Sequence, residues 1–442
     1  MSLTGTPFLY TAVALAALAL ALPFLLWTRL RGPRVLRAAL RALMLLFAQT
    51  TAVTLVFVLV NNANNLYDNW ADLLGTGNHV QRAADLGADG TGGIAYRELP
   101  KVRQSFTQAD GPGMHAAGGV RVTQLKGRVS GVDAEVYVWL PPQYDDPAHK
   151  DEKFPVVELL SGYPGSAKAW YGSMHVHEQL EPLMRAGRVA PFILVAPRTN
   201  LVAKADTGCA NIPGTVNADT WLSIDVPKMI TDNFRAEAAP DGWAAAGYSA
   251  GAHCAAKLAV AHPDRYRAAI SLSGYNDPIG ERASLANQSL ALRRANNPYL
   301  LLREARTPPR VGLYLSGEAG DGYEAAVALA QVAKAPTTVR AVFLPRSAGG
   351  HTMALWRPQV PAAFRWLTEE LSGKAADRPA HGTDPSPSGR PGVPGRPPGA
   401  PPAGRSAPPG RPATPPGRST AGSTPAGPAS GIASRADAAR RP

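Results

Sequence analysis

Two long apolar runs near the N-terminus stand apart from the rest of the hydrophobic pattern. Residues 8–27 and 42–60 carry no charge, and each run is long enough to cross a bilayer as a helix. Five arginines lie in or beside the short connection between the runs: Arg29, Arg31, Arg34, Arg37 and Arg41. Because short arginine-rich loops stay cytoplasmic, the pattern predicts two transmembrane helices whose outer ends both face outward. A cleavable signal peptide is the alternative for the first run, but the arginines follow that run instead of preceding it.

The segment at 61–119 has little periodicity and is predicted to be a juxtamembrane linker. It opens with four asparagines around Ala63, and then Tyr67 and Trp70 fall within 66–74. Aromatic residues at this position are typical of an anchor at the membrane interface. The remainder, 75–119, is rich in Gly, Ala and Asp and predicts one short helix at most.

From residue 120 the pattern changes to short apolar strands that alternate with helices. A hairpin is predicted first, with strands at 120–129 and 134–140 around a turn at 130–133. Further strands are predicted at 155–160, 192–196, 243–246, 268–272, 311–315 and 339–344, and helices at 219–234, 252–261 and 361–371. This order predicts an α/β domain at 120–371 with a mostly parallel sheet and flanking helices.

The last region, 372–442, is rich in Pro, Gly, Ser and Arg and holds 17 of the 42 prolines. It cannot bury enough apolar surface to fold, so we expect a disordered tail. The tail contains ten Lys and Arg against three Asp, which is more than half of the net charge of +12. The body is therefore only mildly basic, which argues against nucleic acid as a partner. We expect the tail to make weak, salt-dependent contacts with anionic wall polymers.

The pentapeptide Gly247-Tyr248-Ser249-Ala250-Gly251 joins a predicted strand to a predicted helix. Gly-x-Ser-x-Gly in that position is the pattern of a nucleophile elbow, which presents a serine hydroxyl above the sheet. The tight turn strains the serine backbone, and side chains two residues to either side would clash, which explains the glycines. Since the pattern arises easily by chance in a Gly-rich chain, its catalytic partners must also be found.

A histidine and an acid in the right order complete a predicted triad. His351 follows the last predicted strand, after a Gly-Gly pair that lets its loop approach the sheet edge. The acid is expected just after the strand at 311–315, where Asp321 and Glu318 both qualify. Asp321 is preferred because glycines flank it, and Asp277 is a weaker candidate.

Two backbone N–H groups are needed to hold the oxyanion of an ester intermediate. Ala250, the residue after the nucleophile, is predicted to supply one of them. Tyr163, in the loop at 161–165 after an early strand, is predicted to supply the other.

The remaining histidines near these motifs fit the triad order less well. His253 lies along the predicted nucleophile helix, so we expect a structural role for it, and His262 precedes Pro263 at the end of that helix. His175 and His177 follow the loop at 161–165 and are expected to line the pocket. A metal site on that pair would need a third ligand that the sequence does not offer, so no metal or cofactor is expected.

Five stretches together resemble a known family: 159–165 (LLSGYPG), 225–227 (DVP), 243–251 (WAAAGYSAG), 262–264 (HPD) and 349–351 (GGH). They are similar to the "Putative esterase" family of α/β hydrolases, with its esterase-D-like enzymes, feruloyl-type esterases and mycolyltransferases. The resemblance covers about 120–371. It implies an α/β-hydrolase fold with little or no lid and a serine acyl-enzyme mechanism, and the hairpin resembles membrane-anchored bacterial envelope members. Ala250 replaces the Gly or Met of many members, which leaves the backbone N–H in place.

We therefore predict a serine carboxylic-ester hydrolase of the cell envelope that uses Ser249, His351 and Asp321. Its substrate is expected to be an acyl ester of a small molecule, a lipid or a glycan. An acyltransferase that moves an acyl group to an envelope glycan, mycolyltransferase-like, is one alternative. A non-catalytic envelope-binding module on the same fold is a second.

Cys209 and Cys254 are the only cysteines, and the predicted topology places both in an oxidising space. Cys254 lies five residues after Ser249, and Cys209 lies in the loop after the strand at 192–196. Both positions are expected near the same edge of the sheet, so a disulfide between them is predicted. Two separate buried thiols are the alternative.

Overall fold

The computed structural model describes residues 3–87, 90–94, 96–346 and 349–372. The predicted disordered tail therefore lies outside the described residues from position 373 onward.

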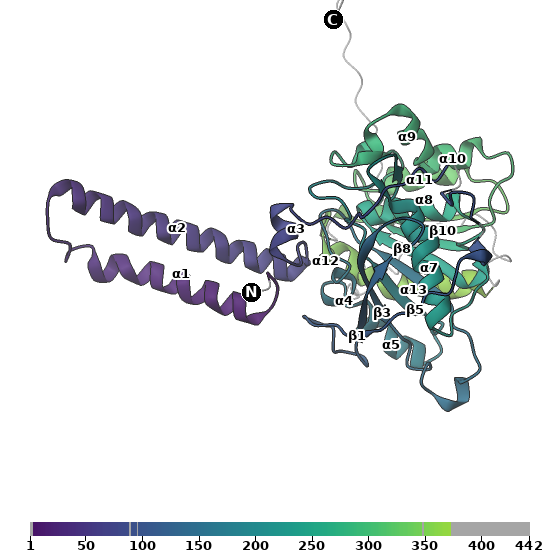
Figure 1. The fold of residues 1–442 in the computed structure, drawn as a ribbon, viewed down its shortest axis with the longest axis horizontal. Coiled ribbons are helices and arrows are strands. Elements are labelled where there is room, and N and C mark those ends of the chain that lie inside the picture. The colour runs from purple at the N-terminus through teal and green to yellow at the C-terminus, as the bar shows by residue number, and fades with distance from the viewer. Residues whose placement is uncertain (1–2, 88–89, 95, 347–348, 373–442) are drawn as a thin grey trace, which may run out of the picture. The chain divides into compact units, whose positions relative to one another are not determined.

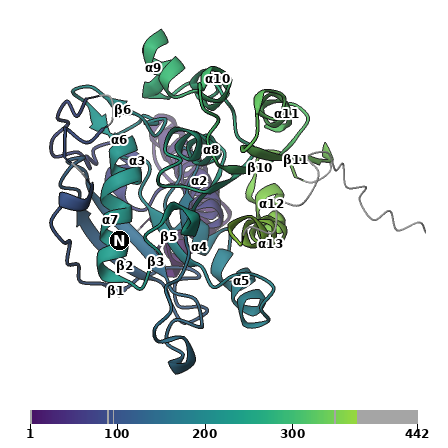
Figure 2. The same ribbon diagram turned by 90° about the vertical axis from the view of Figure 1, so that its right-hand side faces the viewer.

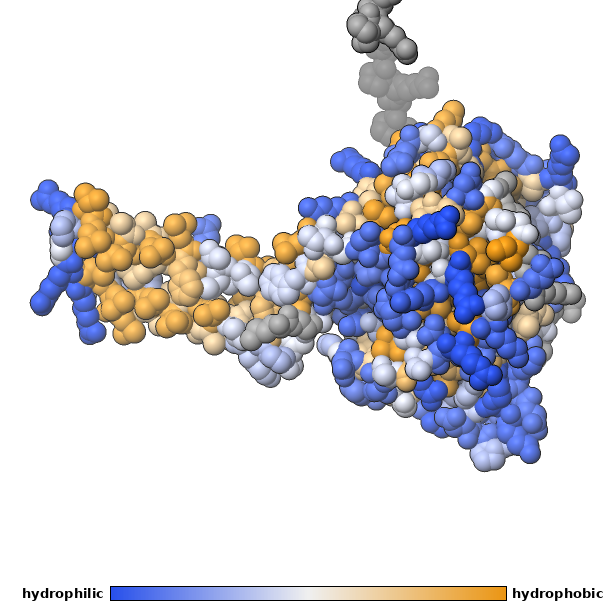
Figure 3. Space-filling view, viewed as in Figure 1, coloured by the Kyte–Doolittle hydropathy of each residue, from blue (hydrophilic) through white to orange (hydrophobic). Residues whose placement is uncertain are grey.

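Two antiparallel helices open the chain, α1 (Thr6–Leu26) and α2 (Arg34–Asn64) (Figure 1). Both are long and apolar enough, by length and composition, to cross a membrane. Little of either helix is buried, and Figure 3 shows apolar surface along both of them. Helix α2 begins before the predicted run at 42–60 and includes three of the five arginines.

The central element of the rest of the chain is a nine-stranded sheet with the order β1-β2-β3-β5-β4-β8-β9-β10-β11. The strands are β1 (Thr107–Gln108), β2 (Arg121–Lys126), β3 (Asp133–Trp139), β4 (Val156–Leu160), β5 (Ile193–Pro197), β8 (Trp243–Tyr248), β9 (Ala268–Leu272), β10 (Gly312–Glu318) and β11 (Thr338–Leu344). The pairs β1–β2, β2–β3 and β3–β5 are antiparallel, and all pairs from β5 to β11 are parallel. Strands β6 (Asn211–Ile212) and β7 (Val216–Asn217) form a separate small hairpin.

Helices cover both faces of this sheet, which explains why every residue of β4, β5, β8 and β9 is buried. They are α4 (Ala169–Gly172), α5 (Val176–Arg185), α6 (Ala218–Thr220), α7 (Val226–Asn233), α8 (Ala250–Ala261), α9 (Leu290–Ala295), α10 (Pro298–Glu304), α11 (Tyr323–Val332), α12 (Met353–Trp356) and α13 (Val360–Leu371). One apolar core contains Met229 of α7 and Leu258 of α8. The other contains Leu180 of α5 and Phe364 of α13, so α8 and α13 lie on opposite faces (Figure 2). This is the α/β-hydrolase fold, as the sequence predicted.

The helix predicted at 219–234 is interrupted in the structure. A π-helical turn at Trp221–Asp225 separates α6 from α7. Pro227 stands at the start of α7, where its missing N–H prevents a regular helical hydrogen bond to the preceding turn. The turn also points Asp225 at the β2–β3 hairpin, where its carboxylate accepts hydrogen bonds from the N–H groups of Val129 and Ser130.

The segment at 61–119 is not the linker that the sequence analysis predicted, because much of it packs onto the sheet domain. Ala109 and Met114 are buried in a core, and β1 pairs with β2. Asn65, directly after α2, donates a hydrogen bond to Ser173 Oγ at 2.7 Å and accepts one from the N–H of Ser166 at 3.0 Å. The segment has weak periodicity because polar contacts to the domain, and not a hydrophobic face of its own, hold much of it in place.

Candidate active site

Ser249 lies at the turn from β8 to α8, with φ 57° and ψ −124°. A non-glycine residue with positive φ is strained, and the surrounding backbone must hold it there. The N–H of Ser249 donates to Leu272 O of β9 at 3.0 Å. A Cβ atom at Gly247 would collide with the carbonyl of Gly251, and one at Gly251 with the carbonyl of Leu160. The structure thus explains both glycines of the predicted elbow.

A chain of two short hydrogen bonds links Ser249, His351 and Asp321. Ser249 Oγ lies 2.8 Å from His351 Nε2, and His351 Nδ1 lies 2.7 Å from Asp321 Oδ1. With its proton on Nδ1, the imidazole donates to Asp321 and accepts from the serine hydroxyl. Asp321 follows β10 and His351 follows β11, so parallel strand ends bring the three residues to one edge of the sheet.

The competing acids have other positions. Glu318 is the last residue of β10 and is buried, and its backbone carbonyl accepts from the N–H of Asp321 at 2.9 Å. Among the described residues, no hydrogen bond or ion pair joins Glu318 to His351. Asp277 instead pairs with Arg293 at 2.8 Å, and this hydrogen bond lowers the pKa of Asp277. Of the three acids, Asp321 is therefore the one that contacts His351 among the described residues, and its catalytic role stays a prediction.

An aromatic cluster that includes Trp356 packs against the ring of His351. The ring of His351 meets the Trp356 ring edge-on, with centroids 4.8 Å apart. Trp356 stacks on Tyr248 at 4.8 Å and donates its Nε1–H to Ser273 Oγ at 3.0 Å. Sequence reasoning missed Trp356, although an aromatic residue five positions after the candidate histidine was the available signal.

Of the two predicted oxyanion residues, Ala250 follows Ser249 directly, and Tyr163 follows Gly162, which packs on Ser249. Gly162 packs so closely that a Cβ atom on it would lie 3.0 Å from Ser249 Cβ, and Tyr163 follows it. Ala250 is the first residue of α8, where amide groups have no acceptor within the helix. Asn200 holds the loop, since its Nδ2 donates to the carbonyls of Gly162 and Gly165. The oxyanion role of Tyr163 and Ala250 stays a prediction.

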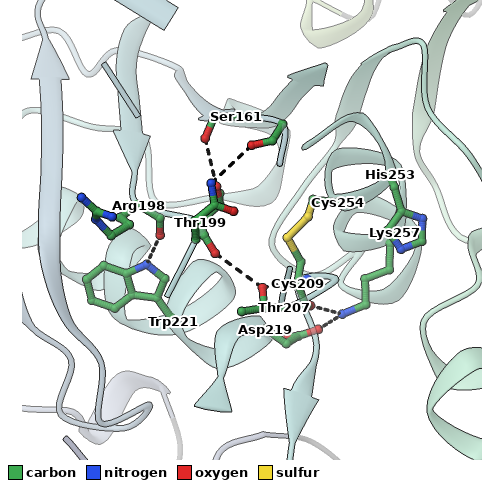
Figure 4. The surroundings of a disulfide bond; sticks show 12 residues. Ser161, Arg198, Thr199, Thr207, Cys209, Asp219, Trp221, His253, Cys254 and Lys257 are labelled. Carbon is green, nitrogen blue, oxygen red and sulfur yellow. Dashed lines mark hydrogen bonds and ion pairs between the residues drawn. A yellow bond between two sulfur atoms is a disulfide. The ribbon is translucent and has the colours of Figure 1, made fainter. Parts of the chain in front are cut away.

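A disulfide joins Cys209 to Cys254, with Cα atoms 5.6 Å apart, and fixes the loop after β5 to α8 (Figure 4). Lys257, one turn further along α8, donates to Cys209 O at 2.9 Å and pairs with Asp219. Burial acts to raise the pKa of Asp219, but Lys257 and His262 lower it well below its usual range. His262 Nε2 lies 2.7 Å from Asp219 Oδ1, so this histidine takes part in the same buried ion-pair cluster.

The side chains of His253, His175 and His177 contact groups other than the Ser249 hydroxyl. His253 is fully buried, its Nδ1 lies 2.9 Å from Tyr275 O, and burial lowers its pKa to about 4. The expectation that His175 and His177 line the pocket is wrong. His177 is fully buried, with Nε2 2.9 Å from Gly113 O, and His175 pairs with Glu178 at 2.8 Å. A histidine within an apolar layer gives no sequence signal that distinguishes it from one at a pocket wall.

The fold and this arrangement are those of an α/β hydrolase of the serine-esterase type. A family model described as "Putative esterase" matches residues 128–367, and the chain belongs to this family.

Relatives of known sequence or structure match parts of the chain. An uncharacterized protein of Corynebacterium glutamicum is 27% identical in an alignment of 262 positions that covers 54% of this chain and 58% of that protein. The MPT51 antigen of Mycobacterium leprae is 43% identical over 65 residues, 15% of this chain and 21% of the antigen. The solved S-formylglutathione hydrolase from Agrobacterium tumefaciens has a TM-score of 0.48 and 17% identity, over 60% of this chain and 98% of its own. The chain thus matches less than two thirds of the length of the two relatives compared by sequence.

Proposed function

We propose that the protein is a serine carboxylic-ester hydrolase that works through an acyl-enzyme on Ser249. The observation that supports this most is the continuous hydrogen-bonded chain from Ser249 Oγ through His351 to Asp321. It begins at a strained serine, and strain of this kind persists only where the surrounding structure holds it.

In the proposed reaction, Ser249 Oγ attacks the ester carbonyl while His351 Nε2 accepts the hydroxyl proton. Asp321 orients the imidazole and stabilises its positive charge. The N–H groups of Tyr163 and Ala250 bind the oxyanion of the tetrahedral intermediate. His351 then gives its proton to the leaving alcohol as the ester C–O bond breaks. Water, activated by the same histidine, attacks the acyl-enzyme and releases the acid and Ser249.

An acyltransferase is the second candidate, and one observation favours keeping it. The His351 side chain is 49% exposed, so an acceptor alcohol has access to this general base from solvent. Turnover of one acyl ester with and without an added sugar acceptor separates the two, because a transferase forms the acylated sugar at the expense of free acid.

We further propose that α1 and α2 anchor the enzyme in the cell membrane, with the catalytic domain outside. The support is the arginine cluster between the helices and the Cys209–Cys254 disulfide, which persists in oxidising surroundings. Alkylation of intact cells without reductant tests it, since a cytoplasmic domain would present two free thiols.

Labelling with a fluorophosphonate probe tests the esterase proposal. Full-length protein in detergent should be labelled on Ser249, and an ester substrate should compete with the probe. Ser249→Ala should lose labelling while its circular dichroism and Tm stay those of the wild type. A wild-type protein that the probe does not label would favour the non-catalytic binding module.

A further inference from the structure

Ser273, the residue directly after β9, has the same uncommon backbone conformation as the nucleophile. Its φ is 56°, against 57° for Ser249, and its side chain is buried. The N–H of Ser273 donates to Ser316 O of β10 at 2.8 Å. A non-glycine residue with positive φ is strained, and such residues cluster at functional sites. The proposed reaction explains the strain at Ser249, whereas Ser273 has no role in it so far.

The hydroxyl of Ser273 bonds the aromatic cluster beside the histidine. It accepts a hydrogen bond from Trp356 Nε1–H at 3.0 Å, and this contact is buried. The same indole meets the His351 ring edge-on at 4.8 Å and stacks on Tyr248 at 4.8 Å. Because a hydrogen bond is directional, the Ser273 hydroxyl fixes the orientation of the indole within this stack. The surface on which His351 packs is therefore set by Ser273.

The backbone of Ser273 packs on the loop that carries the acid. Gly322 follows Asp321 and has a φ of 90°. A Cβ atom on Gly322 would lie 2.7 Å from Ser273 Cα and 2.9 Å from its carbonyl carbon. The two main chains thus touch without a side chain between them. Ser273 therefore contacts both supports of His351, the indole of Trp356 and the loop of Asp321.

The imidazole needs such supports most in the second half of the proposed reaction. Once Ser249 Oγ is acylated, it no longer donates to His351 Nε2. The imidazole then keeps its bond to Asp321 and its contact with Trp356. A small misplacement of a general base can cost as much as about 10²-fold in rate, so the orientation of this ring matters.

We propose that Ser273 and Trp356 are positioning residues that hold the His351 ring in line with Ser249 and Asp321. The proposal rests on the esterase function above and adds two residues to the site. Both act through His351 and not on the substrate, so their loss should lower kcat and leave KM nearly unchanged.

Steady-state hydrolysis of p-nitrophenyl acetate by full-length protein in detergent tests the proposal. Trp356→Phe keeps an aromatic ring but loses the N–H, and Ser273→Ala loses the acceptor. Each should lower kcat by at least about tenfold, with KM within about twofold of the wild-type value. The Tm of each variant checks its fold.

Trp243→Phe is the matched control. Trp243 is buried like Trp356, and its Nε1–H donates to Glu237 O at 2.7 Å. It is the first residue of β8, so it lies at the end of this strand away from Ser249. The control should lose stability and keep the wild-type kcat. If Trp356→Phe lowers kcat no more than Trp243→Phe does, the indole of Trp356 is only structural and the proposal is wrong.

A double variant shows whether the two residues act through their shared hydrogen bond. The kcat of Ser273→Ala/Trp356→Phe should be close to that of Trp356→Phe alone, because the bond is already lost in the single variant. Two losses that multiply would overturn the proposal.

Ser273→Gly gives a second test if Ser273→Ala folds poorly. Glycine adopts a positive φ without strain but offers no acceptor, so this variant should have at least the Tm of Ser273→Ala and an equally low kcat. Wild-type turnover by Ser273→Gly would contradict the proposal. A wild-type protein that neither hydrolyses the ester nor reacts with the fluorophosphonate probe would instead contradict the esterase function itself.

Discussion

The active-site edge and the segment that follows the membrane helices are held in place by opposite means. At the edge, backbone geometry positions the nucleophile: Ser249 has a positive φ, and Gly247 and Gly251 lie against main-chain carbonyls. In segment 66–79, ion pairs hold the chain in place, because Asp68 and Asp72 pair with the buried Arg198. A strained turn of this kind requires particular residues at fixed spacing. An ion-pair cluster requires only that residues far apart in the sequence come into contact in the fold.

Substitutions in the two regions should therefore affect different properties, catalysis in one and stability in the other. Substitutions at the active-site edge should abolish ester turnover while the protein stays folded, because residues other than the proposed triad support the strained turn. Changes at the charge cluster should remove stability first, because an unpaired buried charge is costly. The following variants separate these effects, from the largest to the smallest.

Asp321→Asn should lower kcat by about 10⁴-fold, because the imidazole would lose its orientation and the stabilisation of its charge. Glu318→Gln, three residues away, is the matched control and should change kcat little, since Glu318 has no polar contact with His351 among the described residues. Steady-state hydrolysis of p-nitrophenyl acetate measures both, with Tm as a check of folding. A larger loss in Glu318→Gln would reverse the assignment of the acid.

Removal of the Cys209–Cys254 disulfide should lower the free energy of unfolding by about 4 kcal/mol, the chain-entropy value for a loop of this length. Urea unfolding of the wild type and of Cys209→Ala/Cys254→Ala, each without reductant, measures the difference. Dithiothreitol should destabilise the wild type only. Equal stability of both proteins would show that the bond does not restrain the unfolded chain.

Arg198→Met should lower the free energy of unfolding by about 3 kcal/mol, since it leaves Asp68, Asp72 and Glu135 without their shared cation. Arg293→Met removes an arginine from an ion pair at the surface and should leave the urea midpoint nearly unchanged. If the two variants unfold at the same urea concentration, the charge cluster does not hold the segment in place.

Glu158 offers a contrast to that cluster, because it is fully buried on β4 and has no ion-pair partner among the described residues. Burial raises its pKa to about 8, while the hydroxyl of Tyr266 donates to its Oε2 at 2.7 Å. The folded protein thus holds a proton that the unfolded chain releases above about pH 4.5, so stability should fall as pH rises from there to about 8. The slope can reach about 1.4 kcal/mol per pH unit.

Glu158→Gln should be less sensitive to pH over the same range, since its amide does not titrate. Urea unfolding of both proteins at pH 5 and at about pH 8 gives the comparison. A variant whose stability changes with pH as steeply as that of wild type would mean that Glu158 is not the group responsible.

The two regions also differ in how much the sequence could reveal. The elbow, the order of Ser249, Asp321 and His351, and most strands of the sheet could be predicted because they depend on local pattern and spacing. The docking of Asn65 and Asp68 could not, because their partners Ser173 and Arg198 lie more than a hundred residues away. In the sequence, a polar residue whose burial depends on a partner so far along the chain cannot be distinguished from a residue of an exposed linker.

Two smaller features, the contact of Trp356 with His351 and the π-helical turn, also escape prediction from local pattern. Trp356 supports His351 through ring contacts, and an aromatic residue in a helix predicts burial without indicating what it will touch. The π-helical turn before Pro227 breaks a helix that periodicity alone would continue.

In the proposed reaction, Ser249 carries the acyl group of the covalent intermediate. Full-length protein mixed with p-nitrophenyl acetate and quenched in acid within the first turnovers should contain one acetyl group on the peptide that includes Ser249. Mass spectrometry of the digested protein measures this directly, and Ser249→Ala should show no acetyl group there. Acetylation at a different residue in wild type, or ester turnover by Ser249→Ala at the wild-type rate, would contradict the account.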